Sequence, residues 1–320
     1  MALKKKIVTV KEKALRKDKL FAIDQLILSC AGFMGEAVAP YPEAIAGDNI
    51  SFRLNLIARA DLPVTVEEIN WLNQVETTSL KLNPDSLKTL NHDIKIPENA
   101  ALTEPYWLAQ PAKNAAQFSV LNDTLIGLAE KPSDLNVRLK LRIGPEYIIV
   151  ALPLSYKKLD PVKGDLIEPL RIVPALNVKF VQPVYFLKKE EDLKVSLNFN
   201  AARNFENGTV TFKVGDIPIA TFNATYLNVK NLTIDYIIKK ELLANLSQGQ
   251  FKLSASYTEG NIAYNKDQQI IQYPHLPALQ YFLPAEATVI NADIKITGYC
   301  TIRRWHAFGY VIQHTIKIYT

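Results

Sequence analysis

Short runs in which apolar and polar residues alternate one by one recur along most of this chain. In NISFRLNLIAR, residues 49–59, every second side chain is apolar, which is the period of a β-strand with one buried face. Glycine, proline and asparagine separate such runs, as turns between antiparallel strands require. The pattern therefore predicts an all-β fold of two consecutive immunoglobulin-like antiparallel β-sandwiches, with a leading N-terminal amphipathic helix.

The alternating runs fall into two groups. The first consists of NISFRLNLIAR (49–59), VTVEEINW (64–71), QFSVL (117–121), NVRLKLRI (136–143) and YIIVALPLSY (147–156). The second consists of NVKFVQPVYFL, DLKVSLNFN, GTVTFKV, NLTIDYII and FKLSASYT, all within residues 177–258. A short Gly144-Pro145 turn joins the last two runs of the first group, which predicts a hairpin. The segment KELLANL, residues 240–246, is expected to form one helical turn.

With 320 residues, the chain is long enough for two domains that each bury a core. We expect a basic N-terminus and helix at 1–36, the first sandwich at 37–157 and the second at 176–274. Residues 158–175 are rich in proline and charge, which is typical of an ordered linker. An exit segment and a poorly ordered or out-of-frame tail are expected at 275–320.

The leading helix is inferred from apolar residues that recur at spacings of three and four. These residues are Leu20, Ile23, Ile27, Cys30 and Met34. The same region, LFAIDQLILSC, imitates a lipoprotein signal that ends at Cys30, but Asp24 and Gln25 interrupt its apolar stretch. The sequence therefore predicts neither a convincing export signal nor a transmembrane segment here, and Cys30 is expected to be a small core residue.

The net charge of +5 is concentrated in KKK, residues 4–6, and KEKALRKDK, residues 11–19. No aromatic residues are interleaved with these charges, so a solvated face is expected and nucleic acid is not expected as a partner. Cys30 and Cys300 are the two cysteines, and neither has a CxxC partner. A zinc ribbon and a dense disulfide scaffold are therefore excluded.

Sequence motifs for catalysis are missing. The histidines His92, His275, His306 and His314 form no HxH, HxxH or HExxH pair. The carboxylate pairs Glu67-Glu68 and Glu190-Glu191 are adjacent in sequence, so on a strand they are expected to point to opposite faces. Phosphate-binding glycine motifs and a GxSxG nucleophile elbow are also missing. We therefore predict no catalytic residue, no metal site and no cofactor.

Aromatic residues are the remaining candidates for binding. Trp71 ends an alternating run and is expected in the core. Tyr106 and Trp107 stand side by side in TEPYWLAQP, where Pro105 and Pro111 are expected to fix an extended path. Neighbours on an extended segment point opposite ways, so one ring should pack and the other should reach solvent or a partner. Tyr106 and Trp107 are the predicted binding residues.

Five segments, in order, resemble the C-terminal accessory region of the large PIG-L (LmbE-like) N-acetylglucosaminyl deacetylases of Bacteroidetes. They are AIDQLILSCAGFMGEAVA (22–39), PYPEAIAGDNISFRLNLIARADLPV (40–64), IPENAALTEPYWLAQP (96–111), LPLSYKKLDPVKGDLIEPLRIVP (152–174) and IIQYPHLPALQYFLPAEA (270–287). The first of these segments resembles the helix that follows the catalytic domain in that family. The fourth resembles the inter-domain pattern, with Asp165 in place of a glutamate.

Two departures from the resemblance affect the inferred function. The family's deacetylase activity depends on zinc bound by a His-Pro-Asp-Asp motif and a later His-x-x-His, and neither motif occurs here. No catalytic role is therefore carried over to this chain. The tail KITGYCTIRRWHAFGYVIQHTIKIYT, 295–320, differs from the glycine-rich continuation of the family, which predicts a frameshifted or truncated end. Trp305, His306 and His314 are then expected to have no role.

The resemblance implies a non-catalytic accessory region that supports or orients a deacetylase catalytic domain. The alternative, from the aromatic pair, is a stand-alone carbohydrate-binding or cell-surface adhesion module. Both exclude an enzyme within this chain. The resembling proteins are typically exported, but the location of this chain stays open.

Overall fold

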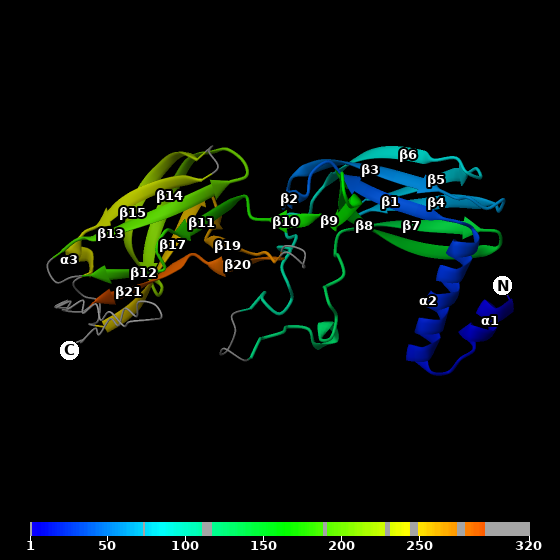
Figure 1. Ribbon diagram of the computed structural model, residues 1–320, viewed down its shortest axis with the longest axis horizontal. Helices are drawn as coiled ribbons and strands as arrows, with labels where there is room; N and C mark the ends of the chain where they lie inside the picture. Colours follow the sequence, from blue (N-terminus) through cyan, green and yellow to red (C-terminus); the bar gives the residue numbers. More distant parts are fainter. Residues whose placement is uncertain are drawn as a thin grey trace, which may run out of the picture. The chain divides into compact units, whose positions relative to one another are not determined.

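The computed structural model describes residues 2–72, 74–110, 117–187, 191–227, 231–243, 249–273 and 279–291 (Figure 1). It divides into two compact units. Unit 1 comprises Met1–Trp107 and Val120–Val173, and unit 2 comprises Leu108–Ser119 and Pro174–Thr320. Strands dominate both units, which confirms the predicted all-β class.

Unit 1 contains ten strands and three helical segments among its described residues. They are α1 (Ala2–Val8), α2 (Lys13–Cys30), β1 (Met34–Ala39), β2 (Glu43–Ile45), β3 (Asn49–Ile57), β4 (Val64–Trp71), β5 (Gln74–Leu82), β6 (Lys88–Lys95), the 3-10 helix η1 (Asp123–Leu125), β7 (Asn136–Ile143), β8 (Glu146–Asp160), β9 (Gly164–Pro169) and β10 (Arg171–Val173).

The long strand β8 joins the two layers of unit 1. The strand order is β5-β4-β7-β8-β1-β3-β6, and β9 also pairs with β8. Up to Pro153, β8 pairs antiparallel with β7, which confirms the predicted hairpin at Gly144-Pro145. From Leu154 it pairs parallel with β1 instead. The change of partner lets one strand belong to both layers, which enclose a single apolar core.

Alternating side chains of β3 fill that core, as the sequence predicts. Phe52, Leu54 and Leu56 are at most 1% exposed, whereas Ser51 and Arg53 face solvent. Trp71, at the end of β4, is 2% exposed, which confirms its predicted core position. Burial of large apolar side chains of this kind contributes roughly 1.5–3 kcal/mol each.

Helix α2 ends earlier than the apolar spacing predicts. The N–H of Phe33 bonds to the carbonyl of Leu28, and the N–H of Gly32 bonds to that of Ser29. Gly32 has φ of +59°, so this end is a Schellman motif. The helix therefore stops before Met34, which lies in β1 and is exposed, because a left-handed glycine terminates it.

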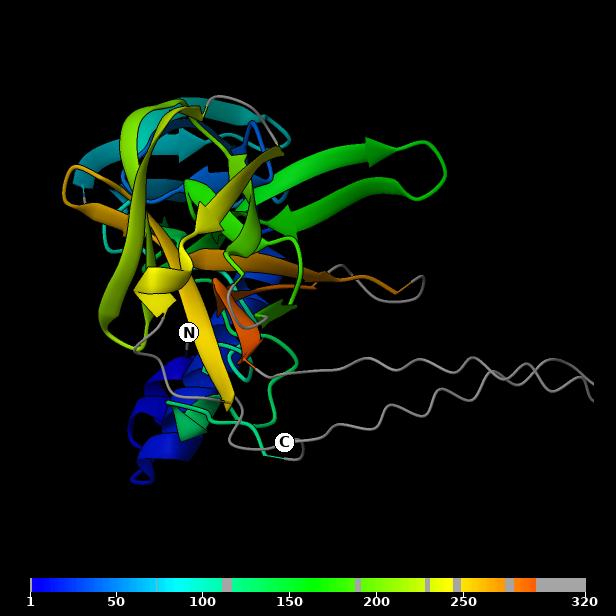
Figure 2. The same ribbon diagram turned by 90° about the vertical axis from the view of Figure 1, so that its left-hand side faces the viewer.

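The predicted linker at 158–175 is replaced by folded structure of unit 1. Strands β8 and β9 pair antiparallel, from Ser155 opposite Pro169 to Asp160 opposite Gly164. They form a projecting hairpin, drawn in green in Figure 2. Strand β10 then pairs in parallel with β2. Lys157 lies between Glu36 and Asp165, and its hydrogen bond to Asp165 raises its pKa. Prolines that suggested a linker lie at strand ends and in the turn, where they are compatible with pairing.

Unit 2 is built from shorter sheets. Its elements are β11 (Leu176–Phe180), β12 (Val184–Leu187), β13 (Leu193–Ala201), β14 (Phe205–Val214), β15 (Ile217–Leu227), β16 (Leu232–Ile238), α3 (Lys240–Leu243), β17 (Gly249–Glu259), β18 (Ile262–Tyr264), β19 (Lys266–Ile271), β20 (Leu279–Pro284) and β21 (Glu286–Asn291). One sheet has the order β11-β13-β16 and another the order β12-β21-β17-β14-β15, while β19 pairs with β20.

Several predicted boundaries change in unit 2. The run at 177–187 forms two strands because Pro183 interrupts it. Strands β20 and β21 extend the folded unit to Asn291, beyond the predicted boundary at 274. In contrast, QFSVL forms no strand: Gln117 forms an isolated β-bridge and residues 118–121 are irregular. Five alternating residues are too few to distinguish a strand from a loop. The predicted helical turn is α3.

An aromatic core fills unit 2 between the two main sheets. Tyr257 of β17 is fully buried and meets the edges of the Phe199 and Phe205 rings at centroid distances of 6.4 and 5.6 Å. Phe180 of β11 and Phe212 of β14 are 6.3 Å apart in the same core. Edge-to-face pairs of this kind add to the stabilisation that burial provides.

Candidate functional site

The segment TEPYW is fixed to the end of unit 1 by Thr103. The backbone N–H of Thr103 donates to the carbonyl of Ile172 at 2.9 Å, and its hydroxyl oxygen accepts from the N–H of Ile172 at 2.8 Å. Ile172 is 2% exposed, so these bonds satisfy buried backbone groups. Thr103 therefore acts as a local partner for β10.

Tyr106 and Trp107 contact each other instead of pointing to opposite sides. Their ring centroids are 4.9 Å apart at 88°, an edge-to-face pair. The Tyr106 hydroxyl donates to the Leu128 carbonyl at 3.1 Å. Residues 106–108 form a turn, so the expected extended path is wrong and the period-2 argument does not apply. Both rings are half-buried, and neither is fully in the core.

Three of the segments that carry the family resemblance meet at this place. Strand β10 pairs with β2, and the Arg171 guanidinium lies 3.3 Å from the Glu43 carboxylate. The N–H of Arg171 also donates to the Pro42 carbonyl at 3.0 Å. Thr103 holds the neighbouring Ile172. These contacts bring together three segments that are distant in sequence, 40–64, 96–111 and 152–174. We call the contact region formed by β2, β10 and Thr103 the joint of unit 1.

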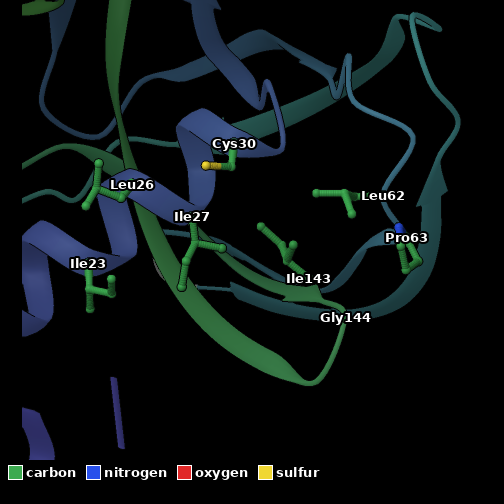
Figure 3. A pocket seen from close by; sticks show the side chains of 8 residues that line it. All are labelled: Ile23, Leu26, Ile27, Cys30, Leu62, Pro63, Ile143 and Gly144. Carbon is green, nitrogen blue, oxygen red and sulfur yellow. The ribbon is translucent and has the colours of Figure 1, made fainter. Parts of the chain in front are cut away.

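An apolar groove of about 300 Å³ lies between α2 and the β7–β8 turn (Figure 3). The residues that line this α2 groove are Ile23, Leu26, Ile27, Cys30, Leu62, Pro63, Ile143 and Gly144. Leu26 is 60% exposed and Leu62 is 43% exposed. Apolar side chains gathered in this way are typical of a surface that another molecule covers.

Cys30 was expected in the core and is instead exposed. Helix α2 buries Leu28, and the adjacent Ala31 is buried with it, while Ile23 and Ile27 are half-buried. The buried stripe thus lies one position away from the predicted one, since the spacing of three and four fits both. The Cys30 sulfur lines the α2 groove in Figure 3.

Glu67 and Glu68 were expected on opposite faces of their strand, and that expectation is wrong. A register shift between Val66 and Glu68 places a bulge in β4. Glu67 then pairs with Arg142 and Glu68 with Lys140, two residues apart on β7 and therefore on one face. Both carboxylates have a basic partner, and the hydrogen bond that Lys140 donates to Glu68 raises the pKa of Lys140.

His92 is the histidine that the structure describes, and it stacks on Trp71 with centroids 4.3 Å apart. The Trp71 indole N–H donates to Glu76 at 3.0 Å. Among the described residues, no three His, Cys, Asp or Glu side chains lie close enough to hold a metal ion. The described part of the chain also contains no helix with the length and apolar character needed to cross a bilayer.

Several sequence-based expectations fall on residues outside the described ranges. They concern Glu190, His275, Cys300, Trp305, His306, His314 and the tail at 295–320.

Comparison with known proteins gives no relative in sequence. The chain matches no family model and no curated protein. Among solved structures, it is similar to the fibronectin(III)-like modules of Clostridium thermocellum CbhA, with 12% identity, a TM-score of 0.24 and coverage of 86% of this chain and 100% of that one.

Two further solved structures show weak similarity. The ICAM-5 D1–D4 ectodomain fragment shares 10% identity at a TM-score of 0.24, over 85% of this chain and 56% of that one. A Porphyromonas gingivalis protein of unknown function shares 8% identity at a TM-score of 0.19, over 81% and 99%. Likeness of this degree says nothing about function.

Proposed function

We propose that this chain is a non-catalytic β-sandwich module that supports or orients the zinc-dependent catalytic domain of a PIG-L-type sugar deacetylase. The observation that carries the proposal is the exposed apolar α2 groove, which the exposed side chains of Leu26 and Leu62 help to line. In the family that the sequence resembles, this helix follows the catalytic domain. The catalytic domain is therefore the molecule that would cover the groove.

The joint at β2, β10 and Thr103 supports the same proposal. Three of the five resembling segments supply its backbone pairs and the Arg171–Glu43 ion pair. An accessory region that orients another domain needs a rigid frame, and hydrogen-bonded backbone provides rigidity. Three segments that carry the resemblance therefore also contact one another in the fold.

Two measurements test this function. Purified chain with added zinc should release no acetate from N-acetylglucosamine oligosaccharides, and release would overturn the proposal. Sequencing the DNA on both sides of the reading frame should then identify the PIG-L-type catalytic domain to be used in binding experiments.

A second candidate function is glycan binding through Tyr106 and Trp107. It is favoured by their partial exposure and by the bond from Tyr106 to Leu128, which holds the pair in one arrangement. Preorganised aromatic rings can stack on sugar faces at low entropic cost. Trp107→Ala should lower affinity for a glycan by about tenfold or more, roughly 1.4 kcal/mol. Phe186→Ala, at an aromatic residue that is 62% exposed on β12, is the matched control.

A further inference from the structure

The outer face of the β14–β15–β17 sheet contains a hollow of about 360 Å³. The residues that line this polar hollow are Asn207, Gly208, Thr209, Asn223, Thr258 and Gly260. Thr209 on β14 lies opposite both Asn223 on β15 and Thr258 on β17. Their side chains form one row across three strands, on the face opposite the buried Val210 and Tyr257.

Two glycines, Gly208 and Gly260, lie in the lining of this hollow. The position of a Cβ on Gly208 points into the core, where it would lie 2.0 Å from Cζ of Tyr257. The Tyr257 ring therefore occupies the core directly beneath the floor of the hollow. Gly260 adds a second position without a side chain at the rim. The lining is held by paired strands, which makes the hollow a fixed feature of the sheet.

The side chains of the hollow are neutral, and each can both donate and accept hydrogen bonds. The Thr209 hydroxyl donates to Oδ1 of Asn223 at 3.3 Å, which orients that amide. No hydrogen bond among the described residues engages the side chains of Asn207 or Thr258. Both are therefore available to a ligand.

The same lining discriminates among ligand classes. It includes no lysine or arginine to neutralise an anion and no carboxylate to hold a hard cation. An apolar ligand would leave the amides and hydroxyls without partners, which costs roughly 1–3 kcal/mol for each buried group. A neutral ligand with many hydroxyl groups meets none of these penalties.

We propose that the polar hollow binds a neutral sugar ring of a glycan. The next row on the same face, Thr221, Thr211 and Ser256, also offers hydroxyls in register, so a second ring can continue over it. The ligand class is that of the second candidate function. The site is a different one, because it lies in unit 2 and involves neither Tyr106 nor Trp107.

The test is titration of the full chain with neutral mono- and disaccharides, with glucuronate as the charged comparison. The protein should be made in a host that does not N-glycosylate, since Asn207 and Asn223 each begin an Asn-x-Thr sequon. We expect binding of at least one neutral sugar, weakened tenfold or more by Thr209→Val and by Asn223→Ala. Thr288→Val, on β21 of the same sheet, should leave affinity unchanged.

Two results would overturn the proposal. One is that no neutral sugar binds to protein whose circular dichroism shows it folded. The other is that a sugar binds but Thr209→Val and Asn223→Ala leave its affinity unchanged. If Trp107→Ala abolishes that binding, the second candidate function stands and the polar hollow is not its site.

Discussion

The ring of Tyr257 lies directly against the backbone of Gly208, on the neighbouring strand. A Cβ at Gly208 would fall 2.0 Å from Cζ and 2.2 Å from the hydroxyl oxygen of Tyr257. Because Tyr257 is fully buried among other aromatic rings, it has no space into which to move. The floor of the polar hollow and the core of unit 2 thus depend on one glycine.

Gly208→Ala should therefore destabilise unit 2 by about 1–3 kcal/mol, because the added methyl group overpacks the core. The free energy of unfolding, measured by urea denaturation monitored with far-ultraviolet circular dichroism, reports this change. In a Tyr257→Leu background the same substitution should cost less, because the ring that it meets is gone. Equal costs in the two backgrounds would show that the contact between these residues is not the cause.

Tyr257→Phe should leave stability unchanged or raise it by up to about 1 kcal/mol, because the buried hydroxyl has no hydrogen-bond partner among the described residues. Burial, with Glu259 nearby, raises the pKa of Tyr257 above its ordinary 10.0. The unfolded chain therefore loses the phenol proton at a lower pH than the folded protein does, and the stability of the Tyr257 protein falls as pH rises from 10.0 through the folded pKa. Unfolding between pH 9 and 11 should separate the two proteins, and parallel curves would contradict this account.

Thr103→Val should loosen the joint of unit 1 by about 1–3 kcal/mol, because it leaves the buried N–H of Ile172 without its acceptor. Thr103→Ser keeps the hydroxyl and is the matched control. Hydrogen exchange at Ile172 measures the effect directly. Unchanged protection in Thr103→Val would mean that this bond does not hold β10.

Asp160 should stabilise the turn of the β8–β9 hairpin. Its carboxylate accepts from the N–H groups of Lys163 and Val162, both at 2.8 Å, and these bonds lower its pKa. The contribution is present above the ordinary pKa of 3.8 and is lost as pH falls through the lower folded value. Asp160→Ala should increase amide exchange at Val162 and Lys163 at neutral pH. A carboxyl pKa of 3.8 or higher, measured by NMR titration, would disprove the arrangement.

Regular alternation made much of the fold predictable. The residues of β3, β7 and β13 show it clearly, because one face of each is buried and the other is not. Strands β5 and β6 were missed since most of their side chains are exposed or half-buried, which removes the contrast. The bulge at Glu68 and the turn at Tyr106 were missed because period-2 reasoning assumes an uninterrupted strand.

The candidate sites depended on contacts that no local pattern encodes. Tyr106 and Trp107 were identified from sequence as unusual, but their mutual contact and the bond to Leu128 require the turn. The α2 groove brings Cys30 together with Leu62 and Ile143, which are far apart in sequence. The end of α2, in contrast, is predictable from the sequence, because Gly32 follows the helical residues and glycine is a common signal for a helix C-terminus.

The most direct test of the proposed accessory function is calorimetric titration of the purified chain into the zinc-loaded PIG-L-type catalytic domain that we expect to be encoded beside it. The account predicts a one-to-one complex that Leu26→Asp weakens at least tenfold, because a charge would be buried in the α2 groove. Val75→Asp, at a side chain that is 61% exposed on β5, should leave binding intact. The absence of such a domain, or of any binding to it, would contradict the central claim.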